Sequence, residues 1–174
     1  MSRKSCKGFT LLEVIFVTAV IGLLSAIAMP TVFRSRIAAN ETAGIGTLRT
    51  VHTAQLTYAL TCGYGNYAST FPDLGNPAGD GYLPLDLTSG LTPMKSGYTY
   101  SLQPGPVGPS GFTDCNGNAT SLDYYVSAAP LTIGSTGWRA FASNQAHVLW
   151  QDLAGVAPVE PFTAGGTIAP LESD

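Results

Sequence analysis

An apolar run near the start of the chain constrains the fold more than any other feature. It extends from Phe9 to Met29, 21 residues, and contains one charged side chain, Glu13. At about 1.5 Å of rise per residue, a helix of this length covers about 30 Å, which is the hydrocarbon thickness of a bilayer. The run therefore predicts a single membrane-spanning helix.

A short basic segment, residues 1–8, precedes the apolar run. Its three basic side chains place it in the cytoplasm by the positive-inside rule, and they place the residues after the run across the membrane. An ordinary secretory signal is cleaved beyond its apolar stretch. Here the candidate cleavage point, between Gly8 and Phe9, comes before that stretch. Cleavage would remove the basic leader and leave the apolar helix on the mature protein.

Glu13 is the residue that a plain membrane anchor does not explain. An acidic group inside a membrane helix costs about 2.5 to 3.5 kcal/mol, so it usually has a partner or a function. Glu13 lies four residues after Phe9, about one helical turn from the amino terminus that cleavage would create. Its carboxylate could pair with that ammonium group on its own chain or on a neighbour. The alternative is a tolerated charge that snorkels to the lipid headgroups.

The segment GFTLLEV, residues 8–14, resembles the processing motif of type IV prepilins and of the related pseudopilins of type II secretion. The resemblance combines a basic leader, a glycine before the cut, a phenylalanine after it, a glutamate fifth in the mature chain and an apolar helix. It implies cleavage after Gly8 by a prepilin peptidase, N-methylation of Phe9, and assembly of the helices into a filament core with the help of Glu13.

The same resemblance implies partners and a location. The subunit would first be a single-pass inner-membrane protein in contact with membrane lipid. An inner-membrane assembly platform would then incorporate it, with other pilins or copies of itself, into a periplasmic or cell-surface filament.

Gly22 and Pro30 lie where pilins often have a glycine and a proline, and both weaken a helix. Proline removes a backbone hydrogen bond and kinks or breaks the helix, and glycine costs about 1 kcal/mol relative to alanine. We therefore predict a bend near Pro30 in the monomer and melting between Gly22 and Pro30 in a filament.

Charged residues make up only 11% of the 174 residues, and the formal net charge is −3. So few charges suit a protein that is held at a membrane or packed among copies of itself. After position 50, two basic side chains oppose nine acidic ones. This balance argues against a nucleic-acid partner.

Cysteine usage fits an oxidising compartment. Cys6 would leave with the leader, so the mature chain keeps Cys62 and Cys115. A bond between them would close a loop of 54 residues and would stabilise the fold by about 4 kcal/mol on the chain-entropy model. The alternative is two buried free thiols, because sequence does not show their separation.

The predicted fold class is α+β and pilin-like, a long membrane-spanning helix continuing into a head with a small antiparallel sheet. We divide the chain into a leader (1–8), a filament-core helix (9–29), a helix continuing into the head (30–60) and the rest of the head (61–174). In the head, Ile45, Leu48 and Leu56 predict a stripe that packs on the sheet. Residues 63–97 predict a long loop, the GPVGPSG run another loop, and residues 154–174 an extended or disordered tail. Strands are predicted at 98–103, 122–129, 138–142 and 146–151, the last two as a hairpin.

Motifs that carry chemistry are missing from the sequence. It contains no G-x-S-x-G elbow, phosphate-binding glycine loop, H-E-x-x-H or metal-spaced cysteine pair. We therefore predict no enzyme activity, cofactor or metal site, with His52 and His147 as isolated packed or surface residues. Calcium binding by Asp73, Asp80 and Asp86 is an alternative to ordinary solvated loop acids. The sequon at Asn118 is a weak glycosylation signal.

Three functions remain from the sequence. The first is a structural subunit of a type IV pilus-like filament that serves adhesion, motility or DNA uptake. The second is a pseudopilin of type II secretion. The third, from another class, is a membrane-tethered binding domain that stays monomeric.

Overall fold

The computed structural model describes residues 9–75 and 81–171 of the chain. It divides into two compact units, residues 1–36 and residues 37–174, and we call the second unit the head. A single helix, α1 (Leu11–Thr61), accounts for most of the first unit and begins the second. The helix ends one residue beyond the end that the sequence predicts.

In the residues that the structure describes, the head follows α1 with two short helical turns and nine strands. A long apolar helix followed by antiparallel sheets confirms the predicted α+β, pilin-like fold class. The remaining elements in chain order are β1 (Tyr67–Ala68), η1 (Pro72–Gly75), α2 (Leu85–Thr88), β2 (Met94–Lys95), β3 (Tyr98–Pro104), β4 (Pro109–Thr113), β5 (Ala119–Ser121), β6 (Tyr124–Pro130), β7 (Ala140–Asn144), β8 (Trp150–Asp152) and β9 (Ile168–Pro170).

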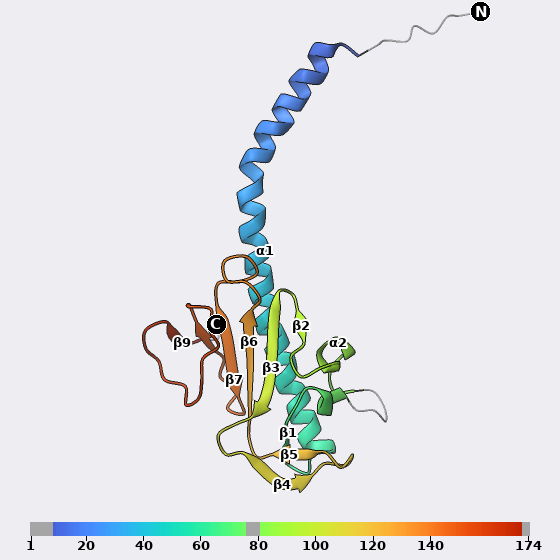
Figure 1. Ribbon diagram of the computed structural model, residues 1–174, viewed down its shortest axis with the longest axis vertical. Helices are drawn as coiled ribbons and strands as arrows, with labels where there is room; N and C mark the ends of the chain where they lie inside the picture. The colour runs from blue at the N-terminus through green and yellow to red at the C-terminus, as the bar shows by residue number, and fades with distance from the viewer. Residues whose placement is uncertain (1–8, 76–80, 172–174) are drawn as a thin grey trace, which may run out of the picture. The chain divides into compact units, whose positions relative to one another are not determined.

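Six of these strands form one antiparallel sheet in the order β2-β3-β6-β7-β8-β9 (Figure 1). Strands β3 and β6 pair in register from Tyr98 opposite Pro130 to Pro104 opposite Tyr124. Strands β7 and β8 pair directly, as the predicted hairpin requires. The segment between β3 and β6 contributes β4 and β5 to a smaller sheet with the order β1-β5-β4.

The core lies between the large sheet and the head part of α1. Alternate residues of β3 are buried, as expected for a strand with one face on a helix. These side chains, with Tyr124 of β6 and Phe141 of β7, form one apolar cluster with α1. The buried residues of β3 are Tyr98, Tyr100 and Leu102, and those of α1 in the cluster include Leu48, Val51 and Tyr58.

The stripe predicted for the helix is wrong at one position. Leu48 is fully buried and Ile45 is partly buried, but Leu56 is 48% exposed. A helix turns about 100° per residue, so the face centred on Leu48 continues through Gln55 and leaves Leu56 to one side. Gln55 is fully buried, and its amide exchanges two hydrogen bonds of 2.9 Å with the backbone of Ala68 in β1.

Three segments predicted to be irregular contain regular structure. The segment 63–97 holds β1, η1, α2 and β2, the GPVGPSG run begins β4, and the C-terminal segment holds β9. In β9, Ala169 pairs with Gln151 of β8. These strands have two to five residues each, and backbone pairing holds them without a longer run of aromatic and β-branched residues.

Candidate functional site

The described chain begins at Phe9, directly after the predicted cleavage point, whose other residue, Gly8, lies outside the described residues. Phe9 is exposed, and α1 starts two residues later. Thr10 caps the helix, because its Oγ1 accepts a hydrogen bond of 3.2 Å from the backbone N–H of Glu13. Thr10 and Glu13 have the spacing of a capping box, T-x-x-E, a sequence signal for a helix start that the motif analysis does not use.

Glu13 is exposed in the first turn of α1. It is the only charged residue between Phe9 and Phe33. A carboxylate also interacts favourably with the positive end of the helix dipole. The residue therefore has a local role at the helix start, and its role in pairing with an amino terminus stays a prediction.

The apolar side chains of residues 9–36 are exposed. Within the described residues α1 is long and apolar enough to cross a membrane, and none of its most apolar stretch is buried. Gly22 and Pro30 both lie inside the helix. A Cβ atom added at Gly22 would have no neighbouring atom within 4 Å apart from the backbone of its own helix. Bending at Pro30 and melting in a filament stay predictions.

Cys62 and Cys115 form a disulfide with their Cα atoms 4.9 Å apart. It joins the residue after α1 to the turn between β4 and β5. The Cys115 N–H also donates a 3.0 Å hydrogen bond to the Cys62 carbonyl. Two segments 53 residues apart in sequence are thus joined at one end of the head.

Asp114, beside this disulfide, is a buried residue that the sequence analysis does not single out. Its carboxylate accepts hydrogen bonds from Tyr58 Oη at 2.8 Å and from the backbone N–H groups of Asn116 and Asn118. Burial would raise the pKa of Asp114, but these hydrogen bonds outweigh it and lower the pKa. The Asn118 side-chain amide also donates to Asp114, so the amide of the sequon is already engaged.

A second link between α1 and the rest of the head, besides the disulfide, lies at the start of the head. There the side chain of Glu41, on α1, contacts the residues that precede β7. Its carboxylate accepts from the backbone N–H groups of Trp138 and Arg139, and the Arg139 guanidinium is 2.7 Å away. Burial opposes ionisation of Glu41, but the hydrogen bonds from Trp138 and Arg139 lower its pKa below the ordinary 4.5. No local sequence pattern reveals this pair, because its members are 98 residues apart.

The two histidines are not isolated, contrary to the sequence prediction. The rings of His52, on α1, and His147, between β7 and β8, stack with centroids 4.7 Å apart. His52 is buried, and its Nδ1 lies 2.6 Å from the Tyr124 hydroxyl. Its Nε2 has no hydrogen-bond partner among the described residues. This arrangement favours a neutral imidazole.

Acidification is therefore expected to destabilise the head through His52. Burial, and then the neighbouring His147, lower the pKa of His52 from 6.5 to about 4. Because the folded state disfavours the proton, this contribution to stability is complete above pH 6.5 and is lost as the pH falls toward about 4. The difference corresponds to about 3 kcal/mol.

Urea unfolding of the full chain in detergent micelles across this pH range measures the effect. His52→Gln removes the titrating group and should flatten the pH dependence. His147→Asn is the matched control, because asparagine tolerates the left-handed backbone of residue 147, with φ of 63°. This variant should keep a weakened dependence. An unchanged pH profile in His52→Gln would assign acid sensitivity to other groups.

Calcium binding finds no support in the geometry. Among residues 9–75 and 81–171, no group of three or more His, Cys, Asp or Glu side chains is placed to hold a metal ion. Asp73 accepts hydrogen bonds from Thr70, and Asp86 pairs with Lys95 at 2.8 Å. Asp80 lies outside the described residues.

Comparison with protein families gives one match, and it covers the N-terminal segment. Residues 3–29 match the family model of the prokaryotic N-terminal methylation motif. The matched range contains Gly8, Phe9, Glu13 and Gly22 and ends before Pro30. No curated protein and no solved structure matches the chain.

The match and the helix agree with a single-pass membrane anchor, and the motif points to a structural subunit rather than an enzyme. This chain therefore carries the N-terminal signature of the type IV pilins and pseudopilins.

Proposed function

We propose that this chain is a structural subunit of a type IV pilus-like filament that is processed between Gly8 and Phe9 and polymerises through the N-terminal part of α1. The observation that carries the proposal is the match to the methylation motif at the start of an exposed apolar helix. A helix with this surface needs either lipid or other apolar helices around it. The membrane supplies the first environment and a filament core the second.

Glu13 gives assembly its specificity in this proposal. Cleavage would leave an ammonium group on Phe9, and N-methylation would keep its charge. An unpaired carboxylate in an apolar environment is costly, so Glu13 favours positions where such an ammonium group is within reach. The partner ammonium belongs to the same chain or to the next subunit.

The further parts of the proposal concern partners and location. They are a prepilin peptidase, an inner-membrane assembly platform, other pilins or copies of this chain, and membrane lipid. Before assembly the subunit is a single-pass inner-membrane protein, and after assembly it is part of a periplasmic or cell-surface filament. The filament serves adhesion, motility or DNA uptake.

A pseudopilin of type II secretion is the second candidate, because the same motif marks both kinds of subunit. Neighbouring genes distinguish them. A retraction ATPase and alignment proteins favour a pilus, and an outer-membrane secretin with several further pseudopilins favours secretion. A processed chain that stays monomeric and binds a ligand would instead support a tethered binding domain.

Mass spectrometry of the native mature protein tests the proposal most directly. We expect a chain that begins at Phe9 and carries one methyl group on its amino terminus. A native chain that begins at Met1, or well after the apolar run, would overturn the proposal.

Glu13→Gln is expected to leave membrane insertion and cleavage intact and to reduce assembly strongly. Glutamine is equally suited to the third helical position of a capping box, so the helix start is preserved while the charge is lost. The measurement is the ratio of filament to membrane-bound subunit in sheared fractions. Thr10→Ala is the matched control, since it removes the helix cap and keeps the carboxylate. Normal assembly of Glu13→Gln would contradict the pairing role.

A further inference from the structure

The connection between β6 and β7 exposes three large apolar side chains. Leu131, Ile133 and Trp138 are 50%, 53% and 57% exposed, and we call these three residues the loop patch. These three side chains neither belong to the apolar core nor take part in the ion pair of Glu41 with Arg139. Exposed apolar side chains that gather in one loop commonly mark an interaction surface.

The loop that carries the patch is held firmly. Asn40 of α1 donates a 2.9 Å hydrogen bond to the Thr136 carbonyl, and the backbone N–H of Trp138 donates a 2.9 Å hydrogen bond to the Glu41 carboxylate. The Trp138 ring lies over Gly134, where an added Cβ would be 3.1 Å from it. The apolar side chains are therefore displayed on an ordered loop, which lowers the entropy cost of binding a partner.

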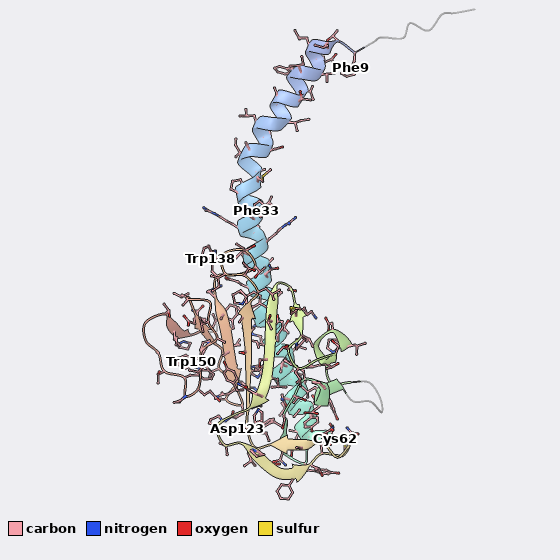
Figure 2. All side chains as sticks on the ribbon, in the orientation of Figure 1. Phe9, Phe33, Cys62, Asp123, Trp138 and Trp150 are labelled. Atoms are coloured by element: carbon pink, nitrogen blue, oxygen red, sulfur yellow. A yellow bond between two sulfur atoms is a disulfide. The ribbon has the colours of Figure 1, made fainter. Side chains whose placement is uncertain are left out.

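The loop patch lies at the end of the head where the chain enters it. The loop that carries the patch contacts Asn40 through Thr136 and Glu41 through the Trp138 backbone, and in Figure 2 Trp138 and Cys62 lie at opposite ends of the head. Asn40 follows Phe33, the last residue of the exposed apolar series, by seven residues. Seven residues span about 10 Å as a helix and at most about 25 Å when extended. Chain connectivity alone keeps this loop near the end of the apolar segment.

The charges along this stretch suit anionic lipid headgroups. Arg34 and Arg36 are the first charged residues after the apolar segment. The next acidic residue, Glu41, is already engaged by Arg139. Basic side chains at the end of a span bind lipid phosphates, and tryptophan prefers the boundary between headgroups and acyl chains.

We propose that, before assembly, the loop patch inserts Trp138 into the phospholipid interface of the bilayer that the apolar helix spans. This inference rests on the proposed membrane-embedded subunit. Contact with lipid holds the head down on the membrane, and incorporation into a filament exposes the patch or transfers it to a neighbouring subunit.

Tryptophan quenching tests the proposal, because the chain has two tryptophans, Trp138 and Trp150. The full chain is reconstituted in phospholipid vesicles that contain lipid brominated either close to the headgroup or near the acyl chain end. Trp150→Phe leaves Trp138 as the probe and keeps an aromatic ring for the stack on Phe162. Trp138→Phe is the matched control, which leaves Trp150 on β8.

We expect the Trp138 probe to emit at shorter wavelength in vesicles and to be quenched at least about twofold more strongly by the shallow bromine than the Trp150 probe. The unsubstituted chain should show the same quenching for part of its emission, which guards against misfolding of either variant. Equal quenching of the two probes would overturn the proposal. A Trp138 shift that appears only at high protein-to-lipid ratio, without bromine quenching, would also overturn it and assign the patch to a second copy.

Failure of this inference is distinguishable from failure of the proposed function. Vesicle flotation in carbonate reports whether the apolar helix is embedded. A chain that floats while Trp138 is unquenched overturns only the loop-patch contact. A chain that is extracted by carbonate overturns the membrane anchoring as well.

Discussion

Replacing both Cys62 and Cys115 by serine is expected to lower the free energy of unfolding of the head by about 4 kcal/mol. The bridged residues are 53 apart in sequence, so the bond removes much of the freedom that this loop would have in the unfolded chain. Natural domains are stable by only about 5 to 15 kcal/mol, so the loss is a large fraction of the total. Urea unfolding of the full chain in detergent micelles measures it.

Reduction of the unsubstituted protein is the control for the serine variant. Reduced protein should unfold at nearly the same urea concentration as the double variant, because both lack the cross-link and differ only in thiol against hydroxyl groups at the two positions. Identical unfolding midpoints for oxidised and reduced protein would show that the bond does not stabilise the head. The hydrogen bonds of Asp114 with Tyr58 and Asn118 should persist in both, since they do not involve sulfur.

Glu41→Ala is expected to cost about 1.5 to 3 kcal/mol, because it removes a buried charged acceptor from an ion pair whose other side chain, Arg139, is 34% exposed. The substitution leaves the Trp138 and Arg139 N–H groups without their acceptor and leaves the Arg139 guanidinium without its carboxylate. Arg139 also donates to Gln151 at 2.9 Å, so part of its hydrogen bonding survives. The measurement is again urea unfolding of the full chain.

Asp86→Ala is the matched control for Glu41→Ala. Asp86 pairs with Lys95 at 2.8 Å, but both side chains are well exposed. Exposed pairs contribute about 0 to 1 kcal/mol, so this variant should unfold close to the parent. Equal losses in the two variants would refute the role assigned to burial of Glu41.

Protonation of Glu41 also makes the stability of the head depend on pH, and it acts at lower pH than protonation of His52. Because its pKa is lowered from 4.5 in the folded state, Glu41 stabilises the head above that value, and the contribution is lost as the pH falls through the lowered pKa. His52 acts between 6.5 and about 4. The cost of Glu41→Ala should therefore be complete above about pH 4.5 and should shrink as the pH falls below that value.

Local patterns predicted the parts of this molecule that are determined within one segment. The apolar run and the helical spacing of apolar residues around Leu48 predict α1, and the run of aromatic and β-branched residues from Tyr98 predicts β3. Strands β1 and β9 could not be predicted, because Ala68 is held by Gln55 and Ala169 by backbone pairing with Gln151. These partners are known only when the fold brings them together.

The residues of the candidate site also divide into those that a local sequence pattern predicts and those that only the fold brings together. The motif around Phe9 and Glu13 is contiguous, so the sequence alone suggests it. The Glu41 and Arg139 pair and the stack of His52 on His147 join residues from distant segments. A polar residue on the inward face of an amphipathic helix is the signal that could have identified Glu41, His52 and Gln55, since such residues usually have buried partners.

The two links between α1 and the rest of the head, the Glu41–Arg139 ion pair and the Cys62–Cys115 disulfide, have a mechanical consequence. Glu41 holds the helix at one end of the head and the Cys62 disulfide ties it at the other. A force along the helix axis would load both links at the same time, in shear. The helix does not peel away from the sheet at either end, because both ends are linked to the rest of the head. In the proposed filament, these two links would let the helix transmit tension while the head stays folded.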